Sequence, residues 1–147
     1  CRCTPGEVAH YLGKISQPLL DRIDLCAEAA PVDFSQISSK KAGESSSVIR
    51  KRVEAVREIQ RLRFAKEEIE FNGEMGKKHL DAYCHMSDEA QRLLERGFKK
   101  IWFSARSYHR ILKVARTIAD MEAAEKIESR HVGEALSYRA FDKKYWN

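Results

Sequence analysis

Residues 104–121 carry apolar and basic side chains in two separate stripes, a pattern that a helix satisfies. At about 100° per residue, the apolar side chains fall within an arc of about 120°, and the basic ones fall on the opposite side. The apolar members are Tyr108, Ile111, Leu112, Ala115, Ile118 and Ala119, and the basic members are Arg106, His109, Arg110, Lys113 and Arg116. With Ser104 as its N-cap, this segment is predicted to form a helix that directs Arg106 and Arg110 away from its own core.

Helix-start signals recur along the rest of the chain. Thr4 precedes Pro5 and is followed three residues later by Glu7, which is the order of a capping box. Ser87 and Ser129 stand ahead of two further segments with helical periodicity. The expected helices span residues 4–14, 47–70, 77–84, 88–101 and 130–139, with one extra turn over 18–23. The pattern predicts an all-α fold in which four to five helices pack as a bundle.

The helix expected over 47–70 also has two stripes. One apolar stripe is expected to face the core, and one basic face is expected to meet solvent or a polyanion. The apolar stripe contains Val48, Ala55, Ile59 and Leu62, is interrupted by Arg52 and is broadened by Val53 and Val56; the basic face contains Arg50, Lys51, Arg57, Arg61 and Lys66. A solvated face is the preferred interpretation, and a DNA-binding track is the alternative.

Residues 23–28 alternate apolar and acidic side chains, which is typical of a short strand. A single strand needs a partner, so we expect it to pair with a sheet that this chain does not contain. Residues 35–47 are small and polar and have no periodicity, as in a mobile connection. We therefore expect residues 1–45 to be loosely packed and the helical core to begin near Ser47.

Composition narrows the class of protein. There are 27 Lys and Arg against 22 Asp and Glu, and the net charge of +5 favours polyanions without requiring nucleic acid. No stretch approaches the ~20 apolar residues of a membrane span, and the start lacks a signal-peptide core, so a cytoplasmic fragment is expected. The four cysteines, at positions 1, 3, 26 and 84, fit no disulfide framework. Cys1 and Cys3 could form one edge of a zinc site completed upstream, but no metal site is expected within this chain.

The sequence contains no motif that could bind a nucleotide without residues from outside this chain. A phosphate-binding loop needs glycines next to a lysine ahead of a helix, and Gly73–Lys78 comes nearest but lacks the spacing and the Ser or Thr. The five histidines are scattered, and no Ser/His/Asp or Cys/His arrangement follows from their spacing. The isolated chain is therefore expected to have no ATPase activity and only weak affinity for ATP.

Four segments together resemble one protein family. They are Ser16–Leu25, Asn72–Met75, Ser104–Asp120 and Ile127–Arg139. The set is similar to the C-terminal part of the magnesium-chelatase-related AAA+ ATPases of the ComM/YifB type, and the resemblance covers essentially the whole chain. The sequence departs from the usual family residues at Gln17 and Cys26, where the family usually has Gly and His.

The resemblance implies roles for individual arginines. Arg106 matches the sensor-2 arginine, which contacts the γ-phosphate of nucleotide bound by the same subunit, and Arg110 is the second candidate for that nucleotide-binding role. Arg22 matches the arginine finger that is supplied to the nucleotide of the neighbouring subunit. A planar, permanently charged guanidinium suits the charge that spreads over a transferring phosphoryl group. The alternative for Arg22 is a structural ion pair with Asp21 or Asp24.

The resemblance also implies domains, cofactors and partners. Residues 1–34 would be the C-terminal remnant of the AAA+ core, 35–46 a linker, and 47–147 the connecting helix and helical lid. ATP and Mg²⁺ are expected in the full-length parent, with none bound by this fragment alone. The expected partners are the rest of its own core and the neighbouring subunits of a hexameric ring, with DNA as a further candidate and no membrane.

Three functions fit these observations. The resemblance favours a part of an ATPase in a bacterial DNA-processing motor that acts in branch migration and natural transformation. The first alternative is a magnesium-chelatase-like subunit that drives metal insertion into a tetrapyrrole. The second is a stand-alone helical DNA-binding module that uses the basic faces of the helices expected over 47–70 and 104–121.

Overall fold

A computed structural model describes residues 2–34, 38, 43–101 and 104–139. The elements are α1 (Pro5–Leu12), α2 (Gln17–Leu20), α4 (Ser46–Arg63), the 3₁₀ turn η1 (Asn72–Glu74), α5 (Lys77–Tyr83), α6 (Asp88–Ile101), α7 (Ala105–Met121) and α8 (Ser129–Ser137). Within these residues, β-pairing is limited to an isolated bridge between Met86 and Ile127. The predicted all-α fold is confirmed.

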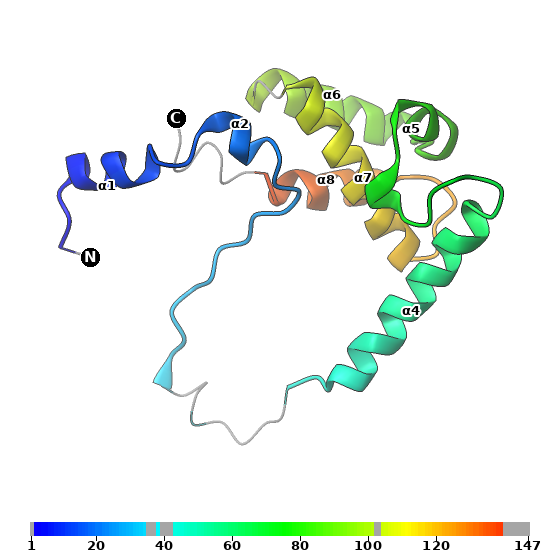
Figure 1. The fold of residues 1–147 in the computed structure, drawn as a ribbon, viewed down its shortest axis with the longest axis horizontal. Coiled ribbons are helices and arrows are strands. Elements are labelled where there is room, and N and C mark those ends of the chain that lie inside the picture. Colours follow the sequence, from blue (N-terminus) through cyan, green and yellow to red (C-terminus); the bar gives the residue numbers. More distant parts are fainter. Residues whose placement is uncertain (1, 35–37, 39–42, 102–103, 140–147) are drawn as a thin grey trace.

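The helix α7 organises the bundle. It packs against α8, α4, α5 and η1, while α6 packs against α8. Figure 1 shows α5 to α8 gathered together, with α1 and α4 extending from them on different sides. The shared core contains Phe64, Met75, Leu80, Leu94, Ile111, Leu112, Ala115, Ile118, Ala119, Ile127, Val132 and Ala135. The apolar face predicted for 104–121 is therefore the face that meets this core.

The second face of α7 is only partly open to solvent. The predicted cap is present, because the Ser104 hydroxyl accepts a hydrogen bond from the Ser107 N–H at 3.1 Å. Arg106 is exposed as predicted. Arg116 is not: it is 1% exposed, so its predicted place on the outer basic face is wrong. The physical reason is that α4 and η1 cover the C-terminal half of this face, where Asp120 provides a buried carboxylate for Arg116.

The helix α4 is shorter than predicted and buries different residues. It ends at Arg63 instead of near 70, because Phe64 turns into the core and its ring meets the Tyr83 ring edge-on at 5.3 Å. The predicted apolar stripe is also wrong, since Val48 and Leu62 are 46% and 71% exposed. Its one buried residue is Gln60. Figure 1 shows the reason: only the C-terminal end of α4 meets the bundle.

The cap of α8 differs from the prediction by one residue. The helix begins at Ser129, so the N-cap is Glu128. The Glu128 N–H donates to Nδ1 of His131 at 2.9 Å, and the other ring nitrogen of His131 lies 3.1 Å from a Glu122 carboxylate oxygen. His131 is fully buried. The Glu128 side chain forms no cap hydrogen bond, so the His131 ring, which accepts from the N-cap N–H, provides only the reciprocal half of a capping box.

The N-terminal region lies partly on the surface and partly against the bundle. The capping box of α1 is present, with Glu7 accepting from the Thr4 N–H at 2.7 Å, and α1 buries none of its residues. The short strand predicted over residues 23–28 is not formed, because the described residues offer this segment no sheet to pair with. Among the N-terminal residues that the structure describes, an exception to loose packing is the turn over residues 20–24, called here the docked turn, where Leu20 is 2% exposed.

Candidate functional site

Arg106 lies in the first turn of α7 and is exposed. Its side chain forms no hydrogen bond or ion pair with any residue that the structure describes. The other two arginines of α7 are engaged: Arg110 is paired with Asp24, and Arg116 with Asp120. Arg106 is therefore the α7 arginine whose guanidinium is available to an external anion.

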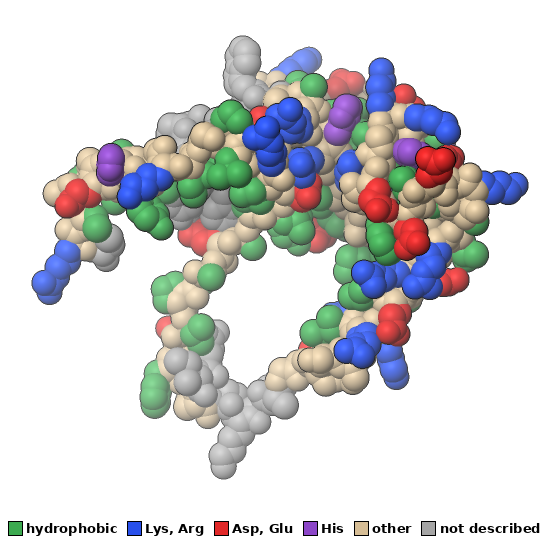
Figure 2. Space-filling view, in the orientation of Figure 1, with side chains coloured by type: hydrophobic (Ala, Val, Ile, Leu, Met, Phe, Trp, Pro, Cys, Tyr) green, Lys and Arg blue, Asp and Glu red, His purple; other side chains and the backbone are tan. Residues whose placement is uncertain are grey.

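Arg22 lies in the docked turn and is also exposed. Its Nη1 donates to the Pro18 carbonyl oxygen at 3.1 Å, one helical turn earlier. Neither of the two carboxylates next to it in the sequence is its partner, so the predicted alternative of an ion pair with Asp21 or Asp24 is not formed. Figure 2 shows basic side chains gathered where α2 and the start of α7 meet.

The carboxylate of Asp21 is bound from the bundle. Its Oδ1 accepts a hydrogen bond from the Ser107 hydroxyl at 3.2 Å, and it lies 3.8 Å from Nη2 of Arg139. Nη1 of Arg139 donates to the carbonyl oxygens of Leu20 at 3.2 Å and of Ile23 at 2.5 Å. Arg139, which follows α8, is 1% exposed. A buried guanidinium thus binds the backbone on both sides of Arg22.

A second group of contacts holds the C-terminal side of the docked turn. Nη1 of Arg110 forms an ion pair with Asp24. The N–H of Cys26 donates to the Tyr138 carbonyl oxygen at 3.1 Å. α7 and the two residues that follow α8 together therefore bind the segment from Leu20 to Cys26.

Sequence reasoning did not assign Ser107 or Arg139 to the site. Both lie in segments that carried the family resemblance, but their partners are 86 and more residues away in the sequence. The sequence does contain one signal for such partners. Asp21 and Asp24 lie on either side of Arg22, and carboxylates that become packed in a turn need cationic or hydroxyl donors.

A buried polar cluster joins α4 to α7 on the far half of the same helix. Asp120 accepts from both Nη groups of Arg63, from Nε of Arg116 at 3.0 Å and from the Asn72 amide at 2.7 Å. Arg116 also donates to the carbonyl oxygens of Glu125 at 2.8 Å and Ala124 at 2.5 Å. Burial lowers the pKa of Arg116, and the Asp120 carboxylate acts in the opposite direction. This cluster fixes the orientation of α7 relative to α4.

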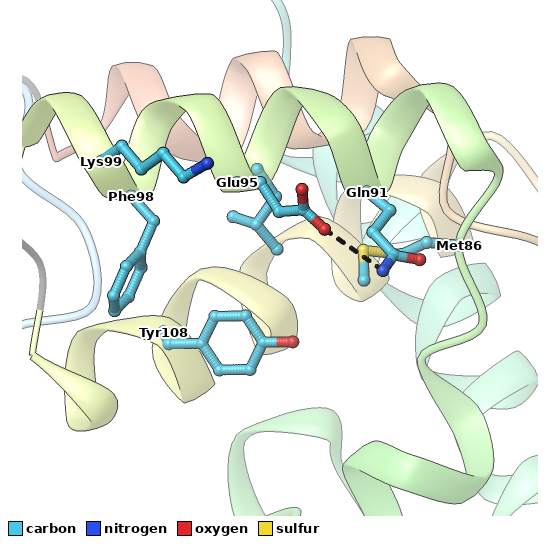
Figure 3. Close-up of a pocket in the computed structure, with 7 residues that line it drawn as sticks. Met86, Gln91, Glu95, Phe98, Lys99 and Tyr108 are labelled. Carbon is cyan, nitrogen blue, oxygen red and sulfur yellow. Dashed lines mark hydrogen bonds between the residues drawn. The ribbon is translucent and has the colours of Figure 1, made fainter.

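A groove lies between α6 and the start of α7, with a volume of about 590 Å³. Figure 3 shows Gln91 and Glu95 of α6 hydrogen bonded to each other at its rim, and the Phe98 and Tyr108 rings at its other end. These two rings meet edge-on, with centroids 6.1 Å apart. Neither Arg22 nor Arg106 lines the groove.

Metal-ligating residues do not gather in the part of the chain that the structure describes. Cys3 is exposed, and Cys1 lies outside the described residues. Cys84 is buried, which raises the pKa of its thiol to about 11. Among the described helices, none is both long and apolar enough to cross a bilayer.

The chain matches two adjoining family descriptions. The family described as magnesium chelatase, subunit ChlI C-terminal, matches residues 43–139, and the one described as magnesium chelatase, subunit ChlI, matches residues 1–37. The helical bundle lies within the first of these matches, and the docked turn lies within the second. The chain belongs to the magnesium chelatase ChlI C-terminal family, and the predicted relationship to the ComM/YifB type of AAA+ ATPase is confirmed.

Individual relatives cover nearly the whole chain. The uncharacterized protein YifB of Salmonella typhimurium is 41% identical over 145 residues, which are 97% of this chain and 28% of the relative. Competence protein ComM of Haemophilus influenzae is 38% identical over 140 residues, or 95% of this chain and 27% of the relative. YifB of Escherichia coli is 38% identical over 144 residues, or 97% and 28%. The chain thus spans little more than a quarter of the length of these relatives.

Proposed function

We propose that this chain is the C-terminal region of an oligomeric AAA+ ATPase and contributes two arginines to ATP hydrolysis. Arg106 acts as the sensor-2 residue on nucleotide held by its own subunit. Arg22 acts as the arginine finger on nucleotide held by a neighbouring subunit. The observation that carries the proposal is that both arginines are exposed, while the turns that bear them are held by hydrogen bonds from Ser107 and Arg139.

The pairing pattern on α7 favours Arg106 over Arg110 as the sensor. Arg106 has no partner among the described residues, so binding an anion breaks no existing interaction. Arg110 would first have to leave Asp24. Arg106 also lies at the N-terminus of a helix of 17 residues, where the helix dipole favours negative charge.

The donor set at Arg22 fits a phosphate group. Only one of its guanidinium nitrogens is used within the described part of the chain, by the carbonyl of Pro18. The remaining N–H groups can form the two parallel hydrogen bonds by which arginine binds phosphate oxygens. ATP and Mg²⁺, bound by the rest of the full-length protein, would supply the γ-phosphate that is transferred. Arg22 and Arg106 would stabilise the charge that develops on it.

We further propose that the full-length protein is a cytoplasmic DNA-processing motor that acts in branch migration during natural transformation. The name of the Haemophilus influenzae relative, competence protein ComM, supports this. The second candidate is an ATPase subunit for magnesium insertion into a tetrapyrrole, which the names of the two matching families support.

The alternative function of a stand-alone DNA-binding module is less well supported by the pairing of the basic residues. Three members of the basic face predicted on α7 are engaged within the protein: Arg110 with Asp24, Arg116 with Asp120, and Lys113 with the Gly73 carbonyl at 2.8 Å. On this face of α7, Arg106 is the permanently charged residue that a phosphate backbone could still reach. The basic face of α4 is not affected by this argument.

Mixed oligomers of the full-length protein test the two arginine roles. A subunit that lacks Arg22 but has an intact nucleotide site should regain hydrolysis beside a neighbour that still supplies its finger. A subunit with Arg106→Ala should stay impaired whatever its neighbour. Equal rescue of both variants would contradict the assignment, and stimulation of ATP hydrolysis by branched DNA would separate the DNA motor from the chelatase-type subunit.

A further inference from the structure

The docked turn is bound on both sides of Arg22 by residues of the bundle. On the N-terminal side, Asp21 accepts from Ser107 at 3.2 Å, and the Leu20 carbonyl accepts from Arg139 at 3.2 Å. On the C-terminal side, the Ile23 carbonyl accepts from the same guanidinium at 2.5 Å. The residue between these contacts is Arg22, which is exposed and whose Nη1 donates to the Pro18 carbonyl oxygen.

Arg139 is suited to hold a backbone turn. Its guanidinium is planar and presents donors in a fixed fork, and here two of its contacts go to carbonyl oxygens three residues apart. Its side chain is almost completely buried, and its hydrogen bond to the Leu20 carbonyl oxygen is buried as well, which strengthens the bond. Leu20 is buried beside it and anchors the same turn through apolar contact. The backbone of the docked turn is therefore held by the bundle, whereas the exposed Arg22 guanidinium is held by a single hydrogen bond to the Pro18 carbonyl oxygen.

The remaining contacts come from the helix that carries Arg106. Ser107 is the next residue in α7, and Arg110 lies one helical turn further on, where it pairs with Asp24. A shift of the N-terminal end of α7 would therefore move Arg106 and the docked turn together. Arg106 and Arg22, which would move together in this way, are the two arginines proposed to act on the nucleotides of different subunits.

The geometry points to a positioning function for Ser107, Arg110 and Arg139: they set the place of Arg22 and couple it to Arg106. Nucleotide that contacts Arg106 in one subunit thereby alters the finger that the same subunit presents to its neighbour. This inference rests on the proposed function, because it assumes that Arg22 acts on a neighbouring site. Coupling of this kind is reciprocal for binding, so nucleotide at the neighbouring site also affects affinity at the first site.

A merely structural docking of the N-terminal segment would predict something different. In that case, removing the contacts of Ser107, Arg110 and Arg139 would lower stability but would have no specific effect on the step that needs Arg22. The exposed ion pair of Arg110 and Asp24 allows this distinction, because its removal leaves the buried core unchanged. Arg130 offers a matched control, since it pairs with Glu122 at 2.7 Å on the surface, away from the docked turn.

The first experiment measures turnover and ATP affinity of the full-length protein with the double variant Ser107→Ala/Arg110→Ala. Turnover should fall by about 10- to 100-fold, the range that a misplacement of about 1 Å produces. The Kd for ATP should stay within about twofold, because Arg106 remains. The double variant Ser107→Ala/Arg110→Lys should recover most of the lost turnover, since lysine keeps the charge that pairs with Asp24. Arg130→Ala should leave both quantities unchanged.

A double-mutant cycle with Arg22→Ala identifies the step that is affected. If Ser107 and Arg110 act through Arg22, their removal adds no further loss once Arg22 is already alanine. Losses that multiply would show that they act elsewhere and would overturn the inference. The same conclusion would follow if the double variant kept its turnover while Arg22→Ala lowered it.

Failure of the proposed function gives a different result. If Arg22→Ala alone leaves turnover unchanged, Arg22 is not an arginine finger. The proposed coupling between Arg106 and Arg22 is then refuted as well. If Arg22→Ala lowers turnover but the positioning variants do not, the finger stands and only the coupling is refuted.

Amide exchange provides a readout on this chain that does not depend on ATP hydrolysis. The N–H groups of Ile23 and Cys26 are hydrogen bonded, the first to Leu20 and the second to Tyr138. Both should exchange at least about tenfold faster in Arg110→Ala than in the unmodified chain, while amides within α7 keep their rates. Exchange of both amides at the rate of an unstructured chain before any substitution would overturn the docking itself.

Discussion

Asp120→Ala should remove more stability than any substitution of an exposed charge in this chain. The Asp120 side chain is completely buried and accepts hydrogen bonds from Arg63, Arg116 and Asn72. Its removal leaves the guanidinium of Arg116, 2% exposed at the side chain, without its carboxylate. Breaking a buried pair in this way costs about 3–5 kcal/mol. Since domains have about 5–15 kcal/mol in total, the variant should lie close to the limit of folding.

Urea unfolding followed by far-ultraviolet circular dichroism measures this effect. The midpoint should fall while the slope m stays constant, because the surface exposed on unfolding is nearly the same. Asp24→Ala is the matched control: it also removes a carboxylate paired with an arginine, but Asp24 is 56% exposed, so the loss should be under about 1 kcal/mol. If the two variants lost equal stability, or if Asp120→Ala lost less than about 1 kcal/mol, the buried cluster would not be what holds α4 to α7.

Three further predictions concern the same chain. Arg106→Ala should change the free energy of unfolding by no more than about 0.5 kcal/mol, whereas Ile111→Ala, at a position 1% exposed, should cost about 2–5 kcal/mol; equal losses in thermal unfolding would mark Arg106 as a structural residue. Calorimetry should detect no tight stoichiometric binding of ATP and a coupled assay no hydrolysis, because the chain carries no phosphate-binding loop. At pH 8 a thiol reagent should modify exposed Cys3 long before buried Cys84: a thiol pKa of about 11 leaves a thiolate fraction of about 10⁻³ at that pH, and the fraction increases as the pH approaches 11.

The positions of most helices could be predicted from the sequence because their signals are local. The Thr4 and Ser104 caps, and the apolar stripe around Ile111, depend on residues within one or two helical turns. The family resemblance extended this local information to candidate roles for Arg22 and Arg106, which remain predictions. The end of α4 at Arg63 was not predictable in this way, because it depends on Phe64 packing against Tyr83.

The docked turn was not predictable for a similar reason. The alternating pattern over residues 23–28 predicts a strand, and a strand without its sheet is expected to be loosely packed. Arg139, more than 110 residues further along the chain, instead donates to the carbonyl oxygens of Leu20 and of Ile23, the first residue of this segment. Buried carbonyl groups need a partner, but the sequence does not show whether a strand or a single guanidinium provides it.

The basic face of α7 is exposed at its N-terminal end and buried at its C-terminal end, a difference that the angular positions of its residues do not predict. Arg106 and Arg116 both fall outside the apolar arc, but one is exposed and the other buried, because angle gives direction and not what covers the helix. A signal that separates them was present: Asp120 follows Arg116 by four residues and falls at about −40° on the same scale, within the basic arc. An acid placed among bases on one face can neutralise them when that face is covered. Arg106 has no acid at a spacing of three or four residues, since His109 and Arg110 occupy those positions, and it is the arginine that the fold leaves available.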